Sequence, residues 1–161
     1  MAETYNLKEN TMQNTLEFVV SGKPIGKARP RFTKSGHIYT PKETKQYEDR
    51  IKQAAWSEMK KANLKPTDKR VSFIICAYFD IPKSYNKQKT MECEFGVHIP
   101  KRPDLDNIVK AVLDGCNEVV YEDDCMVGNI YASKKYCDQE QIAHLHVKIH
   151  WSNYERPNTN I

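Results

Sequence analysis

The stretch Val71-Ser-Phe-Ile-Ile-Cys-Ala-Tyr-Phe79 decides the fold, because it is an almost unbroken apolar run of strand-forming residues. β-Branched and aromatic side chains favour strands, and a run this apolar is typical of a strand inside a sheet. Pro82 follows closely and ends the strand, since proline has no N–H for the ladder. The sequence therefore predicts a sheet with residues 71–79 at its centre.

Other strands are expected on both sides of this run. Residues 16–21 are β-prone, and residues 35–40 are predicted to form a turn and a short returning strand. Residues 126–135 and 142–151 alternate between apolar and polar side chains. We expect these last two strands to pair as a hairpin.

Two helices are also expected. The first begins at Thr40-Pro41, because threonine is a frequent N-cap, proline suits the first turn and Glu43 completes a capping box. It runs to about Lys61, and the second runs over about 105–119. Apolar residues recur at helical spacing at Tyr47, Ile51, Ala54, Ala55 and Met59 in the first helix, and at Leu105, Ile108, Val109, Val112, Leu113 and Cys116 in the second.

A chain of 161 residues with this order of elements fits one α/β domain of the mixed α+β kind. In it, two main helices pack on one mixed sheet. We expect the domain to span residues 15–152, with flexible tails at 1–14 and 153–161. Residues 83–100 show no clear period and are expected to form a lysine-rich loop or a short helix.

The compartment is predicted from the cysteines and the N-terminus. The five cysteines are widely spaced and contain no Cys-x-x-Cys pair, which argues against a zinc site or a secreted disulfide framework. The N-terminus lacks the pattern of a signal peptide, and no apolar run approaches the length of a membrane span. We expect reduced thiols in a cytoplasmic protein with no membrane partner.

The charge of the chain is unevenly distributed around a formal net value of +4. Residues 23–52 contain nine basic and three acidic side chains, whereas residues 101–124 contain seven acidic and three basic ones. A polyanion would be attracted to the first region and repelled by the second unless a metal ion neutralised the acids. This distribution favours a metal-dependent enzyme that acts on nucleic acid.

The acidic region contains the run Asp104-Leu-Asp-Asn-Ile-Val-Lys110, and the pair Asp123-Asp124 follows the predicted helix. Carboxylates suit Mg²⁺ or Mn²⁺, and a nearby lysine can stabilise a phosphate transition state or shift a proton. Helix capping, or a surface ion pair worth about 0.3–0.5 kcal/mol, explains part of the run equally well. The residues alone leave these interpretations open and do not choose between the paired aspartates.

Three histidines, at positions 144, 146 and 150, alternate along the last predicted strand. Metal ligation there would need a further partner, and the sequence offers none nearby. We therefore expect an ordinary strand face.

A known family has a similar signature. The run Arg102-Pro-Asp-Leu-Asp-Asn-Ile-Val-Lys-Ala-Val-Leu-Asp114, with Val120-Tyr-Glu-Asp-Asp124, resembles the RusA-type Holliday junction resolvases, which phages and prophages often encode. Residues 29–31, 39–42 and 47–48 resemble the N-terminal half of that family. The similarity covers roughly residues 16–150, and Cys125-Met126 departs from it because polar residues are more usual there.

The resemblance implies a homodimer that binds four-way junction DNA and cuts two opposed strands symmetrically with Mg²⁺ or Mn²⁺, in DNA recombination and repair. By position it implies Asp104, Asp106 and Asp124 as metal ligands and, with Lys110, as catalytic residues. It thus favours Asp124 over its neighbour. Residues expected to support the ligands are Asn107, Asp114 and Asp123. Residues expected to hold the DNA backbone are Lys27, Arg29, Arg31, Lys34, Lys83, Lys87 and Lys89.

Two other functions stay open. A metal-dependent nuclease for another branched DNA or for RNA would use the same carboxylates and bases. A junction-binding protein without catalysis would need the acids only for structure, which the full set of carboxylates with Lys110 disfavours. A Ca²⁺-binding protein of the EF-hand type is excluded, because the Asp-x-Asp-x-Asp-Gly spacing is absent.

Overall fold

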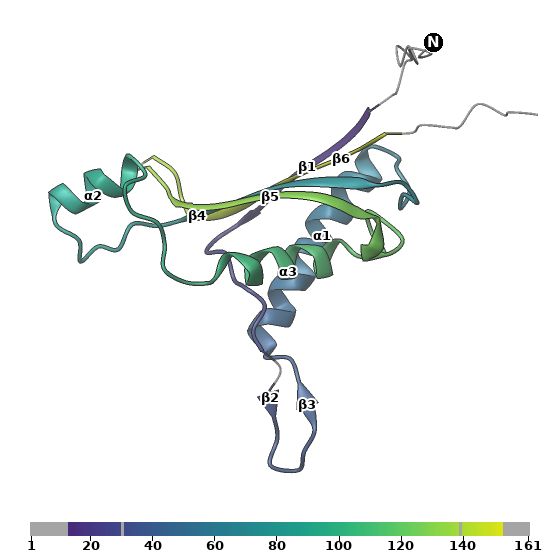
Figure 1. Ribbon diagram of the computed structural model, residues 1–161, viewed down its shortest axis with the longest axis horizontal. Helices are drawn as coiled ribbons and strands as arrows, with labels where there is room; N and C mark the ends of the chain where they lie inside the picture. The colour runs from purple at the N-terminus through teal and green to yellow at the C-terminus, as the bar shows by residue number, and fades with distance from the viewer. Residues whose placement is uncertain (1–12, 30, 139, 153–161) are drawn as a thin grey trace, which may run out of the picture.

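The computed structural model describes residues 13–29, 31–138 and 140–152. Its centre is a four-stranded sheet in the order β1-β6-β4-β5 (Figure 1). The strands are β1 (Gln13–Ser21), β4 (Val71–Phe79), β5 (Val127–Tyr136) and β6 (His144–Ser152). Strand β6 is antiparallel to both β1 and β4, whereas β5 runs parallel to β4. The fold is one α+β domain around a mixed sheet, as the sequence predicts.

The two long helices, α1 (Lys42–Lys61) and α3 (Leu105–Cys116), lie on the same side of the sheet (Figure 1). The short helix α2 (Lys87–Glu94) stands at one end of the molecule. A hairpin of β2 (Arg31–Phe32) and β3 (Ile38–Tyr39) projects from the body before α1. The 3-10 turn η1 (Asp124–Met126) leads into β5.

Strand β4 lies between β6 and β5, which confirms its central place. Its odd-numbered side chains, Val71 to Phe79, are buried, while Ile74 on the opposite face is 39% exposed. On that open face His146 bonds Glu17 at 2.7 Å and His150 bonds Thr15 at 3.0 Å. These contacts fit the ordinary strand face expected for the histidines.

Helix α3 packs against α1 as well as the sheet. A Cβ atom on Gly115 would lie 2.6 Å from Ile51 Cγ2 and 3.1 Å from the Glu48 carbonyl oxygen. Only glycine permits this approach, because close-packed helices leave no room for a methyl group. Ala111, one turn earlier, is also buried. The apolar stripe predicted from the sequence missed this second buried side.

Three local predictions were wrong. Residues 126–135 and 142–151 do not pair as a hairpin, because β4 lies between β5 and β6. Helix α1 has Pro41 at its N-cap with no side-chain capping bond, so the capping box does not form. Helix α3 ends at Cys116 rather than Val119, and Glu118 has a left-handed backbone (φ 61°) that cannot continue the helix.

Residues 83–100, expected to form a loop or a short helix, contain the short helix α2. This helix begins where the Asn86 side chain accepts the Lys89 N–H at 2.9 Å. The predicted tails lie outside the described residues, except that Gln13 and Asn14 belong to β1. The five cysteines are free. Among the described residues, no helix has the length and apolar character needed to cross a membrane.

Gly115→Ala should lower the free energy of unfolding by about 1–3 kcal/mol, because the added methyl group overpacks the contact between α3 and α1. Chemical denaturation measures this change. In an Ile51→Ala background, which removes the nearest atom, the same substitution should cost less. Equal costs in the two backgrounds would show that this contact does not limit the approach of the helices.

Candidate metal centre and nucleic-acid interface

Asp104 occupies the N-cap position of α3 with an extended backbone (φ −67°, ψ 145°). A capping aspartate accepts an N–H from the first helical turn, but this side chain makes no capping hydrogen bond. Helix capping therefore does not account for Asp104. Its carboxylate is exposed and available to a cation.

Asp106 and Lys110 face each other one turn apart on α3. Their Oδ2 and Nζ atoms are 3.5 Å apart, and their side chains are 66% and 62% exposed. An ion pair this exposed contributes little to stability, about 0.3–0.5 kcal/mol. The effect of this ion pair is to keep the positive charge of Lys110 beside the carboxylates at the start of the helix.

The two consecutive aspartates after the helix have different surroundings. Asp123 caps η1 and accepts the Cys125 N–H at 2.9 Å, and this hydrogen bond lowers the pKa of its carboxyl group. Asp124 lies inside η1 and is exposed. Since the first carboxylate is engaged by the backbone, Asp124 is the better candidate for a ligand.

Asp124 lies toward the far end of α3 from Asp104. The Tyr121 hydroxyl donates to the Leu113 carbonyl at 2.8 Å, which holds the chain beside the last turns of the helix (Figure 1). A helix of 12 residues is about 18 Å long. Within the described ranges, no three His, Cys, Asp or Glu side chains are grouped so as to hold a metal ion. The chain thus presents two aspartates at the start of α3 and a third carboxylate at a distance from them.

The predicted DNA contact Lys27 has partners inside the protein. Its Nζ lies 3.0 Å from Glu48 Oε1 on α1 and also pairs with Asp114 on α3. Partial burial acts to lower the pKa of Lys27, but the hydrogen bonds that its ammonium group donates to these two carboxylates outweigh this effect and raise the pKa. The positive charge of Lys27 is therefore compensated. Asp114 takes part in this pairing, through which Lys27 bridges α1 and α3.

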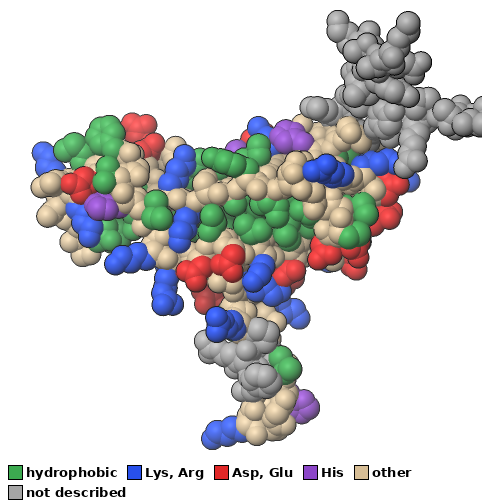
Figure 2. Space-filling view, viewed as in Figure 1, with side chains coloured by type: hydrophobic (Ala, Val, Ile, Leu, Met, Phe, Trp, Pro, Cys, Tyr) green, Lys and Arg blue, Asp and Glu red, His purple; other side chains and the backbone are tan. Residues whose placement is uncertain are grey.

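The other predicted DNA contacts fall in two places. One place is the β2–β3 hairpin, residues 31–39, which together with the preceding Arg29 is called the basic arm. Arg29 and Lys34 are exposed there, and Arg31 lies in β2. Exposed lysines beside or within α2 are Lys83, Lys87 and Lys89. Acidic side chains gather on the body near α3, with basic side chains below them on the arm and toward the α2 end (Figure 2). This arrangement fits a polyanion that touches the protein on both sides of the acids.

The extended segment of residues 23–28, which precedes the basic arm in the chain, packs against the start of α3. The Lys27 N–H donates to the Asn107 carbonyl at 2.8 Å. A Cβ atom on Gly26 would lie 2.9 Å from Pro103 Cβ and 3.0 Å from Asn107 Cβ. The sequence marks Gly26 only as a break after a strand, and it gives no sign of this close approach.

Exposed carboxylates therefore lie at the start of α3, with Lys110 beside them and two basic surfaces nearby. The sequence matches the family described as Endodeoxyribonuclease RusA over residues 21–150, and the chain belongs to this family. It is also 29% identical over 133 residues to the uncharacterized protein YqaN of Bacillus subtilis (strain 168). That alignment covers 79% of this chain and 92% of YqaN.

Gly26→Ala should separate the extended segment from α3, because the new methyl group meets Pro103 and Asn107. The Lys27 amide should then exchange its hydrogen faster, since its bond to the Asn107 carbonyl is lengthened or broken. Hydrogen exchange followed by NMR measures this. The Thr67 amide, bonded to Val120 at 2.9 Å, is the internal control and should not change. Unchanged protection at Lys27 would contradict the steric argument.

Proposed function

We propose that this protein is an Mg²⁺-dependent crossover junction endodeoxyribonuclease, with Mn²⁺ as an alternative ion. It resolves four-way DNA junctions by paired symmetric nicks during recombination and repair, in the cytoplasm of a bacterium that carries it on its chromosome or a prophage. The observation that carries the proposal is the exposed Asp104 carboxylate, which makes no capping hydrogen bond, at the helix start beside Asp106 and Lys110 in a chain of the RusA family.

Asp104 and Asp106 are the proposed first ligands of the metal ion, with Asp124 as the third. Carboxylate oxygens are the donors that Mg²⁺ and Mn²⁺ prefer. When bound, such an ion lowers the pKa of a coordinated water and offsets charge on the leaving oxygen. Lys110 stands beside Asp106 and supplies positive charge, or a proton, to the phosphate that is cut.

A second subunit is part of the proposal. Within one chain Asp124 lies toward the other end of α3 from Asp104, and the described residues group no three possible ligands. In this proposal a neighbouring subunit or the DNA phosphate completes the coordination. A two-fold dimer also suits the substrate, because a four-way junction presents two symmetry-related strands and each subunit can cut one.

The basic arm and the α2 end are the proposed DNA surfaces. Their contacts are to phosphates, through Arg29, Arg31 and Lys34 on the arm and the lysines near α2. Contacts of this kind carry little sequence information, so recognition follows the shape of the junction. Lys27 is left out of this set, because its charge is compensated by Glu48 and Asp114.

Asp104→Asn should abolish cleavage of a fixed four-way junction in Mg²⁺ while keeping or strengthening junction binding, because it removes a negative charge beside the phosphate. A gel cleavage assay and a binding titration measure the two effects. Asp49→Asn changes an exposed acid on α1 that is outside the proposed ligand set, and it should behave as the wild type. Full activity of Asp104→Asn would remove this residue from the metal site. Cleavage of flaps or RNA but not junctions by the wild-type protein would assign another substrate.

Replacing both Arg29 and Lys34 by alanine should weaken junction binding and reduce the slope of log K against log salt by about 1 for each phosphate that these side chains no longer neutralise. Titrations at several salt concentrations give the slope. Lys27→Met is the contrast, and it should leave the slope unchanged because its carboxylate partners already compensate the charge. An unchanged slope in the double variant would place the arm away from the DNA.

A further inference from the structure

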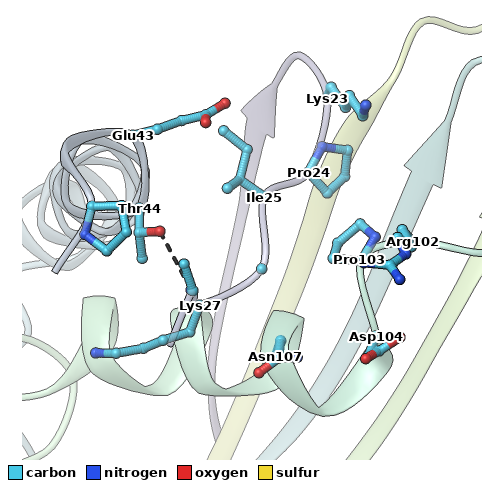
Figure 3. Close-up of a pocket in the computed structure, with 13 residues that line it drawn as sticks. Lys23, Pro24, Ile25, Lys27, Glu43, Thr44, Arg102, Pro103, Asp104 and Asn107 are labelled. Carbon is cyan, nitrogen blue, oxygen red and sulfur yellow. Dashed lines mark hydrogen bonds between the residues drawn. The ribbon is translucent and has the colours of Figure 1, made fainter. Parts of the chain in front are cut away.

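A cavity of about 490 Å³ opens directly beside Asp104. Three segments meet around it: residues 23–28, the start of α1 at Pro41 to Thr44, and residues 102–107 (Figure 3). In the close-up, Glu43 and Thr44 project from α1 on one side, while Pro103, Asp104 and Asn107 lie on the other. Its volume falls within the roughly 300–1,000 Å³ typical of small-molecule pockets. The cavity therefore has room for a group of the substrate next to the proposed metal site.

The walls of this cavity are joined to one another by contacts within the protein. The Lys27 N–H bonds the Asn107 carbonyl at 2.8 Å, and the Ala28 N–H bonds the Thr44 hydroxyl at 3.4 Å. Pro24 is buried, and Gly26 lies against Pro103 with no room for a side chain. A ligand would thus enter a preformed space, which reduces the entropic cost of binding.

The lining combines flat apolar surfaces with a few polar atoms. Pro24, Ile25, Pro41 and Pro103 supply ring and aliphatic carbons, and Glu43 and Asn107 supply a carboxylate and an amide. A nucleobase has the matching chemistry, because its faces are apolar and its edge carries hydrogen-bond donors and acceptors. The cations Lys23 and Arg102 are exposed members of the lining and fit the phosphates on either side of such a base.

We propose that this cavity receives one nucleobase that leaves the stack at the branch point, next to the phosphate held at Asp104. The inference rests on the proposed function and adds a substrate subsite to it. Extrusion of a base breaks its stacking and its pairing, and the cost is least where pairing is already disturbed, as at a branch. A base held here would determine which phosphate of the cut strand lies at Asp104. Continuous duplex DNA would not offer an unstacked base so readily.

The test uses a fixed four-way junction. Cleavage in Mg²⁺ first identifies the cut phosphate. 2-Aminopurine, whose fluorescence rises when it leaves the base stack, then replaces each flanking base in turn. The wild-type protein is added with Ca²⁺ in place of Mg²⁺, under conditions in which a gel shows no cutting, so that a cation still neutralises the carboxylates. We expect a rise at one of the flanking positions.

Ala28→Leu narrows the cavity and keeps the backbone bond to Thr44. It should remove the fluorescence rise and slow cleavage by about tenfold or more, with the affinity for the junction unchanged. Ala62→Leu, the same change at the exposed C-cap of α1, should match the wild type. If Ala28→Leu does not fold, as judged by its unfolding transition, Pro41→Phe fills the same space from α1 and is expected to give the same two effects.

No rise at either flanking base with the wild-type protein would overturn the inference. The inference would also be overturned if a folded cavity-filling variant gave the same fluorescence rise and the same cleavage rate as the wild-type protein. Neither result bears on the proposed function, which fails on a different observation, namely the absence of junction cleavage by the wild-type protein in Mg²⁺.

Discussion

The hydrogen bond from the Lys27 N–H to the Asn107 carbonyl, 2.8 Å long, is the interaction on which the candidate site depends. It joins the segment that carries the basic arm to the first turn of the helix that carries the acids. Gly26 permits the approach, and the Lys27 side chain strengthens it by pairing with both α1 and α3. The segment that leads to the basic residues is therefore held against the helix that carries the acids, although the two are far apart in the sequence.

The proposed ligands are exposed, and this has an energetic consequence. Asp104, Asp106 and Asp124 remain in contact with water, where repulsion between like charges is weak because the effective dielectric constant is high. The fold therefore does not need the metal ion to offset a buried charge. Its stability comes from the apolar side of the sheet and from the close contact of α1 with α3 at Gly115.

Much of this arrangement could be predicted from local patterns in the sequence. The apolar run in β4, the helical spacing of Tyr47 and Ile51, and the start of α3 are signals carried within a few residues, and the structure confirms them. The parallel pairing of β5 with β4 could not be predicted in this way. Strands 126–135 and 142–151 look like a hairpin locally, but the long crossover through α3 places β4 between them.

The roles of single polar residues were harder to predict, because tertiary position decides them. Lys27 lies in a basic segment, and nothing nearby in the sequence shows that Glu48 and Asp114 will compensate its charge. Thr44 has no capping signature, but its hydroxyl accepts the Ala28 N–H at the cavity wall. The signature of carboxylates and lysine was visible in the sequence, whereas the cavity beside it arises only when three distant segments meet.

The strand order also determines when the chain can fold during its synthesis. Strand β1 is paired with β6, and β4 has β6 and β5 as its two neighbours. Each of these partners comes from residues 127–152, so the first 126 residues emerge from the ribosome with no sheet partner for β1 or β4. Helices α1 and α3 then have no completed apolar surface to pack on. The basic arm is therefore made before the residues that complete the sheet, and α3 gains its full packing surface only once β6 pairs with β1 and β4.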